Sequence, residues 1–410
     1  MRHPGKAWTT VNPSVPARVL PVIVFSQFAG TSLWFATNAV MPDLQAAWGL
    51  APSAVSTLTS VVQLGFVMGT LVFALLTIAD RYRPTRLFLV CAVAGAVANA
   101  AAAFLPTGAW AALLASRFAV GFLLAGVYPV GMRIAASWYR EGLGAALGLL
   151  VGALVLGTAL PYGLRAAGWG EGAPSLLSWQ GVLLGVSLLA IAGGLATALL
   201  LPDAPHGVVA RQKISARGLV AIWSDRRLRA SVFGYFGHMW ELYTFYVLVP
   251  FILASRVAAP AVSATAFWVI ASGVLGCVGG GLLARRMGSA RVARTQLAMS
   301  GACALAAPWL LHAPLPVFTA WLLVWGITVA GDSPQFSALS ARNAPPQLVG
   351  SVLTFANCIG FGITVLSIEL FVRGTRVMPL EVLLPGLALG PAVGLWMLRP
   401  LLAGEPARSR

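Results

Sequence analysis

The sequence predicts an all-α polytopic membrane protein of twelve transmembrane helices, arranged as two pseudo-symmetric bundles of six. Three observations predict this fold: the composition, a series of long apolar segments, and a pattern repeated in the two halves of the chain. Of the 410 residues, 59% are hydrophobic and only 9% are charged, whereas soluble domains carry about 25% charged residues. This composition excludes an ordinary soluble protein.

Twelve segments are apolar over the roughly 20 residues that a helix needs to cross a bilayer. Each is expected to form one transmembrane helix. In chain order they are 19–41, 54–78, 87–105, 110–138, 142–164, 181–201, 230–254, 261–283, 292–311, 317–339, 349–371 and 380–398.

Arginine-rich connections alternate along the chain with connections that contain no lysine or arginine. The first kind comprises 79–86, 202–229 and 284–294; the second comprises 43–52, 106–109 and 312–316. Basic residues are retained on the cytoplasmic side of a membrane. We therefore expect a multi-pass protein of the cell membrane, that of a bacterial inner membrane, with both termini cytoplasmic. The net charge of +16 follows from this pattern and does not indicate nucleic-acid binding.

The two halves of the chain repeat one another, because the basic turns at 79–86 and 284–291 follow the second and the eighth apolar segments. A duplicated six-helix unit predicts such matched turns. The expected division is a cytoplasmic tail (1–18), a first bundle (19–201), a cytoplasmic central loop with an interfacial helix (202–229), a second bundle (230–398) and a cytoplasmic tail (399–410).

The whole chain resembles the major facilitator superfamily, whose loop motif after the second helix is roughly G-x-x-x-D-R-x-G-R-R. In the first basic turn, Asp80 and Arg81 match the D-R pair of this motif and Arg86 matches a later basic position, but the usual glycine is missing. In the second basic turn, Arg285 occupies the position of the acidic residue. In the family this turn restrains the switch between inward- and outward-facing states. The resemblance implies that gating role for Asp80, Arg81, Arg86, Arg286, Gly288 and Arg291.

The fourth and fifth segments resemble the branches that carry organic anions or cyanate. The resemblance rests on Arg117 and Gly121 in the pattern L-x-x-x-R-x-x-x-G, on the run 126–129 (GVYP), and on the junction 138–142 (WYREG). It implies transport of a small anionic or polar solute. The asparagine-containing glycine signature of nitrate transporters is absent from 148–163.

Arg117 is the candidate anchor for an anionic solute. It lies well inside the fourth segment, where an arginine stays charged and must face a partner or a wet cavity. It could bind an oxyanion through its planar fork, or pair with an acidic side chain or helix carbonyls. Further polar or aromatic candidates for solute binding are Tyr128, Gln27, Asn38, Gln63, Trp240, Gln335 and Asn357.

Three titratable residues in the second half are candidates for proton coupling. Glu241 and Asp332 lie near the middle of their segments, where a carboxylate is costly and is seldom kept without a use. His238 is one helical turn from Glu241, and its ring titrates near neutral pH. The alternatives are a fixed ion pair for Glu241, a hydrogen bond to a neighbouring helix for His238, and, for Asp332, a cap at the helix break that Pro334 predicts.

These observations predict a monomeric, proton-coupled symporter of a small anionic or polar solute, working by alternating access. The alternative is a proton-coupled efflux antiporter for a cationic or lipophilic compound. A non-transporting membrane receptor is a third class, but the large soluble appendage that it would predict is missing. The sequence contains no nucleotide-binding loop, metal-ligand spacing or serine–histidine arrangement. We therefore expect no enzymatic activity, cofactor or metal, and no nucleic-acid partner.

Overall fold

The structure is a computed structural model that describes residues 15–139, 143–167, 178–202 and 214–402; within these ranges it is helical and contains no strand. The first half contains α1 (Val19–Thr31), α2 (Ala36–Ala39), α3 (Met41–Trp48), α4 (Ala54–Leu75), α5 (Ile78–Arg81), α6 (Pro84–Ala102), α7 (Trp110–Leu124), α8 (Tyr128–Trp138), α9 (Leu143–Ala167) and α10 (Trp179–Leu200).

The second half opens with a short amphipathic helix and continues with six spans. Its elements are α11 (Arg217–Ser224), α12 (Arg226–Ala254), α13 (Ala259–Ala271), α14 (Gly273–Met287), α15 (Ser289–Leu305), α16 (Ala307–Leu310), α17 (Leu315–Gly331), α18 (Ser333–Asn343), α19 (Val349–Gly374), α20 (Leu380–Leu383), the 3₁₀ helix η1 (Leu384–Ala388) and α21 (Leu389–Leu402).

Ten helical stretches among the described residues are long and apolar enough to cross a membrane. Three are built from two helices that meet at a break: α7 with α8, α13 with α14, and α17 with α18. The other two predicted spans are shorter. The first is interrupted at 32–35, between α1 and α2, and the ninth is the 17-residue α15 followed by α16. The prediction of one continuous first helix over 19–41 is therefore wrong.

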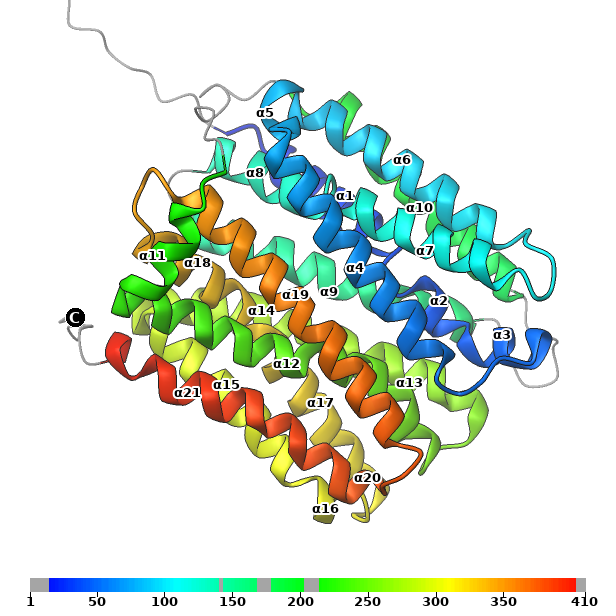
Figure 1. Cartoon of the computed structure of the whole chain (residues 1–410). Helices are drawn as coiled ribbons and strands as arrows, with labels where there is room; N and C mark the ends of the chain where they lie inside the picture. Colours follow the sequence, from blue (N-terminus) through cyan, green and yellow to red (C-terminus); the bar gives the residue numbers. More distant parts are fainter. Residues whose placement is uncertain (1–14, 140–142, 168–177, 203–213, 403–410) are drawn as a thin grey trace, which may run out of the picture.

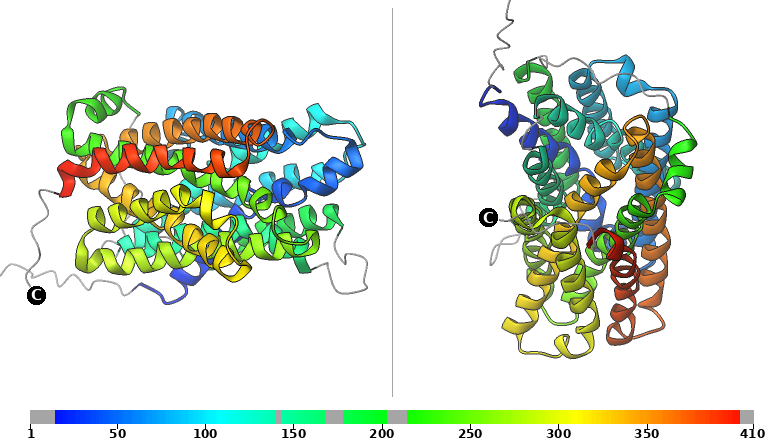
Figure 2. Two further views of the ribbon diagram at one scale, coloured as in Figure 1. Left: turned by 90° about the horizontal axis from the view of Figure 1, so that it is seen from below. Right: turned by 90° about the vertical axis from the view of Figure 1, so that its left-hand side faces the viewer.

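The two halves lie side by side as bundles of roughly parallel helices (Figure 1). They meet along two seams. At one seam α4 packs against α19, and at the other α9 packs against α13 and α14. Figure 2 shows the same helices from two further directions. This packing supports the proposed division into two six-helix bundles.

The arginines of the connecting turns gather at one end of the molecule. We call this the basic end; in Figure 1 it carries α5 and α11, and the opposite end carries α3 and α20. The turns that reach the basic end contribute Arg81, Arg83, Arg86, Arg217, Arg226, Arg227, Arg285, Arg286, Arg291 and Arg294. A single basic face is what the alternating pattern of connections predicts for the cytoplasmic side.

Glycine allows the closest approach between helices in the second half. A Cβ atom on Gly276 of α14 would overlap the carbonyl oxygen of Ile327 in α17, and nothing lies within 4 Å of the equivalent atom on Gly279. Small residues at helix contacts allow close backbone packing in membranes. The backbones of α14 and α17 therefore touch at Gly276.

Polar contacts join the halves at the end opposite the basic end. Arg165 of α9 pairs with both carboxylate oxygens of Asp43 in α3, at 2.9 and 3.1 Å, and donates to Ser263 of α13 at 2.8 Å. At the other seam, Glu369 of α19 accepts from Ser56 and Ser60 of α4, at 3.1 and 3.3 Å. In this conformation both seams are therefore held by polar contacts near that end.

Candidate functional site

A small cavity lies between the two halves. Its volume of about 20 Å³ is room for roughly one water molecule, so this cavity is too small for an organic solute in this conformation. The first half lines it with Tyr128, Val151, Leu154 and Val155, and the second half with Tyr235, Met239, Leu242, Tyr243, Tyr246, Ala330, Ser333 and Phe361.

The helix α12 presents different residues on different sides. Its cavity-lining residues recur at the spacing of one helical face, from Tyr235 to Tyr246. His238 and Glu241 are not among the lining residues and are buried, with 1% of each residue exposed. The cavity wall is therefore aromatic and uncharged, and the titratable side chains lie behind it within the second half.

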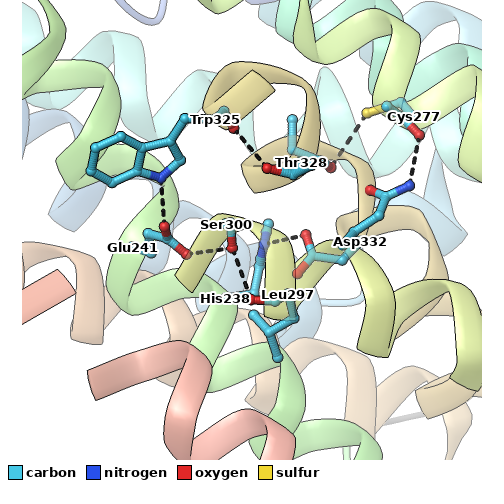
Figure 3. A network of polar contacts seen from close by, with 11 residues as sticks. His238, Glu241, Cys277, Leu297, Ser300, Trp325, Thr328 and Asp332 are labelled. Atoms are coloured by element: carbon cyan, nitrogen blue, oxygen red, sulfur yellow. Dashed lines mark hydrogen bonds and ion pairs between the residues drawn. The ribbon is translucent and has the colours of Figure 1, made fainter. Parts of the chain in front are cut away.

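His238 and Asp332 form a buried pair behind the cavity wall (Figure 3). His238 Nδ1 lies 2.7 Å from Asp332 Oδ1, an ion-pair distance when the ring is protonated. Both ring nitrogens and both carboxyl oxygens of Asp332 are buried, and apart from this ion-pair contact none of them has a hydrogen-bond partner within the described residues. A buried pair that can hold one more or one fewer proton is a group that can carry a proton.

Asp332 owes its position to a break between helices. The helix α17 ends at Gly331 and α18 begins at Ser333, with Pro334 in its first turn, where a proline is tolerated because that N–H has no helical partner. The Asp332 side chain makes no capping hydrogen bond. Its carboxyl group instead faces His238, so the break places an acidic group at the centre of the second half.

Glu241 lies one turn further along α12 and has a donor on each carboxyl oxygen. Trp325 Nε1 donates to Oε1 at 2.7 Å, and Ser300 Oγ lies 2.8 Å from Oε2. The same Ser300 oxygen lies 3.1 Å from the carbonyl of Leu297. A hydroxyl has one proton, so Ser300 can donate to a charged Glu241, or donate to Leu297 and accept from a protonated one. This environment accommodates both states of Glu241.

Arg117 is fully buried in α7. Both of its terminal nitrogens, Nη1 and Nη2, donate hydrogen bonds to other parts of the protein. Nη1 donates to Asn99 Oδ1 at 2.7 Å, and Nη2 donates to the carbonyls of Leu33 and Trp34 at 2.8 and 3.1 Å. These carbonyls belong to the interruption of the first span, where the helical ladder is broken. Bonding to helix carbonyls was one of the two alternatives that the sequence allowed for Arg117. The other, anchoring an anionic solute, stays a prediction.

Of the other predicted solute-binding residues, only Tyr128 lines the cavity. Asn38 donates to Thr59 at 2.7 Å, and Gln63 accepts from Trp34 at 3.2 Å. Trp240 donates to the Gly386 carbonyl at 3.2 Å, toward η1. The remaining three are buried or half-buried and do not line the cavity: Gln27, Gln335 and Asn357.

Sequence reasoning missed most of the cavity wall. Tyr235, Tyr246 and Phe361 were not candidates, although α12 carries its tyrosines at helical spacing. That spacing is the signal that could have revealed them. It was obscured because nearly every position of α12 in the span is apolar or aromatic, so no single face is distinguished by hydrophobicity.

The predicted gating residues lie at the basic end. Asp80 of α5 pairs with Arg133 of α8 at 2.6 Å, and Arg81 donates to Thr77 at 3.3 Å. Gly288 joins α14 to α15 with φ of +85°, which glycine adopts readily. Arg86 and Arg286 are exposed and Arg291 is half-buried. Residues 140–142 of the predicted junction motif lie outside the described residues.

The paired bundles, the interrupted helices and the buried titratable site define a polytopic membrane transporter. A model of the Major Facilitator Superfamily matches residues 23–367, and the chain belongs to this family. Family membership makes it a transporter of small molecules across a membrane, not an enzyme.

Solved structures with the same fold are transporters too. The human organic anion transporter MFSD10 (TETRAN) superposes with a TM-score of 0.70 at 15% identity, over 93% of this chain and 99% of that one. A bacterial homologue of the human lysosomal transporter Spinster, in an inward-facing conformation, superposes with a TM-score of 0.64 at 14% sequence identity, over 94% of each chain. The fucose:proton symporter FucP of E. coli superposes with a TM-score of 0.65 at 16% sequence identity, over 93% of this chain and 97% of that one. No curated protein matches the sequence.

Proposed function

We propose that this protein couples the movement of a small organic solute to that of protons, by alternating access of the cavity between its two halves. The observation that carries the proposal is the buried pair of His238 and Asp332, which lies directly behind the cavity wall. Ionisable groups kept inside a membrane protein are typically functional. Glu241, whose hydrogen bonds suit both protonation states, is the second proton-accepting group.

The two seams supply the structural basis for alternation. Their polar contacts lie toward one end, so releasing Arg165 and Glu369 from their partners opens that end. Rocking of two repeated bundles about a central site is the usual motion of such folds. The cavity, too small for a solute in this conformation, enlarges when the halves separate at either end.

The solute has two candidate classes. The sequence favours symport of a small anionic or polar solute, and similar folds include an organic anion transporter and a fucose:proton symporter. The structure adds an observation in favour of the alternative, exchange of a cationic or lipophilic compound for protons. Arg117, the anchor that an anion would need, is bonded to Asn99 and to helix carbonyls.

We also propose that the protein works as a monomer in a bacterial inner membrane, with the basic end and both termini in the cytoplasm. The single basic face supports this orientation. A cysteine placed at each end in turn, labelled in whole cells with a membrane-impermeant maleimide, tests it. Labelling at the basic end of intact cells would reverse the orientation.

Proteoliposomes that contain a pH-sensitive dye test the coupling. We expect one of three added probes, fucose, benzoate or benzyltrimethylammonium, to move protons across the membrane. A symported solute acidifies the lumen and an exchanged solute makes it alkaline. Asp332→Asn should abolish this proton movement and keep solute counterflow at saturating solute, because counterflow needs no net proton transfer. Glu381→Gln, at a carboxylate in α20 remote from the pair, is the control and should behave as wild type.

If Asp332→Asn retains full solute-driven proton movement, the pair does not carry the coupling proton. If Glu241→Gln alone abolishes it, Glu241 is the coupling group and His238 with Asp332 has another role.

A further inference from the structure

We infer that the solute is an organic cation with an aromatic or apolar body, bound between Tyr128 of the first half and the tyrosine face of α12. The inference deepens the proposed function and rests on it, because the cavity is a solute site only in a transporter that alternates around it. It follows from the composition of the wall, from the charge behind the wall, and from the placement of Arg117.

The wall of the cavity is built of aromatic rings and carries no formal charge. Four tyrosines and Phe361 line it, together with aliphatic side chains, Met239 and Ser333. Two rings of the second half, Tyr243 and Phe361, have centroids 5.4 Å apart, and both pack near Trp34 of the first half. The faces of such rings attract cations, and aromatic cages recognise quaternary ammonium groups.

The carboxyl group of Asp332, paired with His238, lies behind the wall. Asp332 is fully buried, and its neighbours Ala330 and Ser333 are part of the cavity lining. Tyr246 extends from α12 toward the same region; its hydroxyl is buried without a hydrogen-bond partner in the described residues, within electrostatic reach of Asp332. A ligand in the cavity therefore lies beside a carboxyl group, across a single layer of side chains.

An anion in this cavity would lack a counter-charge. No arginine, lysine or histidine lines the wall, and the guanidinium of Arg117 is bonded to Asn99 and two carbonyls. Charges interact strongly in a site with little water, so when the His238 ring is neutral and Asp332 is ionised, an anion beside the pair would be repelled and a cation attracted. The unpaired tyrosine hydroxyl can accept from a protonated amine or donate to a neutral polar group.

The cation and the proton then compete for the same negative charge. The titratable groups around Asp332 are His238, Glu241 and Tyr246 on α12 and Cys277 on α14. When the solute enters, its charge favours release of a proton from this group. When a proton returns, it weakens the attraction for the solute. Exchange of one cation for protons follows, and solute affinity should rise with pH.

Three probes that share one ring separate the charge classes: benzyltrimethylammonium, benzyl alcohol and benzoate. Binding to the full-length protein in detergent is measured by calorimetry, with no pH gradient. We expect benzyltrimethylammonium to bind about tenfold more tightly than either of the others. The affinity should fall when the pH is lowered from about 8 to about 5, because protons then compete with the cation for the charge of Asp332.

Variants test the position of the site. Asp332→Asn should reduce the affinity for benzyltrimethylammonium about tenfold and remove its pH dependence. Tyr246→Phe keeps the ring and removes the hydroxyl, so it should preserve most of the cation affinity, whereas Tyr246→Leu should reduce it. Glu381→Gln removes a carboxylate outside the cavity and should have no effect. The Tyr246 variants also provide a measurement if Asp332→Asn does not fold.

Equal or tighter binding of benzoate would overturn the inference, and so would no binding of benzyltrimethylammonium up to about 10 mM. The binding order is independent of proton coupling. If the proteoliposomes show no proton movement and the cation still binds most tightly, only the proposed coupling fails. If coupling is present and benzoate binds most tightly, only the inference about the solute fails.

Discussion

Arg117 of α7 donates from Nη2 to the carbonyl oxygen of Leu33, at 2.8 Å, where the first span is interrupted. In an unbroken helix this carbonyl would accept a hydrogen bond from a backbone N–H of the same helix, and the side chain of Arg117 takes the place of that donor. A side chain that bonds carbonyls at a break holds the two parts of the span in place. The contact explains why a charge is kept in the middle of a membrane helix.

Arg117→Gln should destabilise the protein by about 3 kcal/mol, because it leaves buried carbonyls without a donor. We expect a lower midpoint of thermal unfolding in detergent, with Arg117→Lys intermediate. Arg373→Gln, at an exposed side chain of α19, is the matched control. A variant at position 117 that unfolds like wild type and has lost solute binding would restore the anchor role.

Gly276→Ala should destabilise the second half by roughly 1–3 kcal/mol, since a methyl group there meets the backbone of α17 at Ile327. Gly279→Ala makes the same chemical change on the same helix, three residues on, where space is open. It should leave stability unchanged or raise it slightly, because alanine favours helix. Equal thermal midpoints for the two variants would show that α14 and α17 are not in backbone contact.

The pair of Asp80 and Arg133 should influence the rate of switching more than the stability. Asp80→Asn and Arg133→Gln each remove a partly buried ion pair at 2.6 Å, a change of about 1 kcal/mol in the balance between conformations. Each should change solute counterflow severalfold. The exchanged variant, with Asp80→Arg and Arg133→Asp, should restore most of it. Failure of the exchange to restore activity would assign the two residues separate roles.

Arg165→Gln should open the end of the molecule opposite the basic end more often. The change removes the contacts to Asp43 and Ser263. A Ser60→Cys reporter at the other seam, buried between α4 and α19, then reacts faster with a polar maleimide. We expect an increase of about fivefold, equivalent to about 1 kcal/mol. An unchanged labelling rate would mean that the two seams open independently.

The sequence predicted the number and position of the spans well, because crossing a bilayer requires long apolar segments and these are visible in any window. It did not predict the interruption at 32–35, which contains neither glycine nor proline. That break is stabilised by Arg117, which lies on another helix and is itself bonded to Asn99. Local sequence carries no signal for a bond of that kind.

The titratable residues of the candidate site stand out in the sequence, but their partners do not. A charge in an apolar segment is conspicuous, so His238, Glu241 and Asp332 could be selected from the sequence alone. That His238 faces Asp332 while Glu241 faces Ser300 and Trp325 depends on how α12 packs against α15, α17 and α18. Helix rotation decides such pairings, and an almost uniformly apolar helix does not reveal its rotation.

All the side chains that bond Glu241 or pair with Asp332 come from the second bundle, whereas Tyr128 and its aliphatic neighbours in α8 and α9 come from the first. Under the proposed coupling, the second bundle would hold the proton-carrying groups, and the first would contribute part of the wall around the solute. Substitutions in α8 and α9 would then alter which compound is carried and leave the proton-carrying groups in place. The proposal thus implies that solute specificity can change by mutation of the first bundle alone.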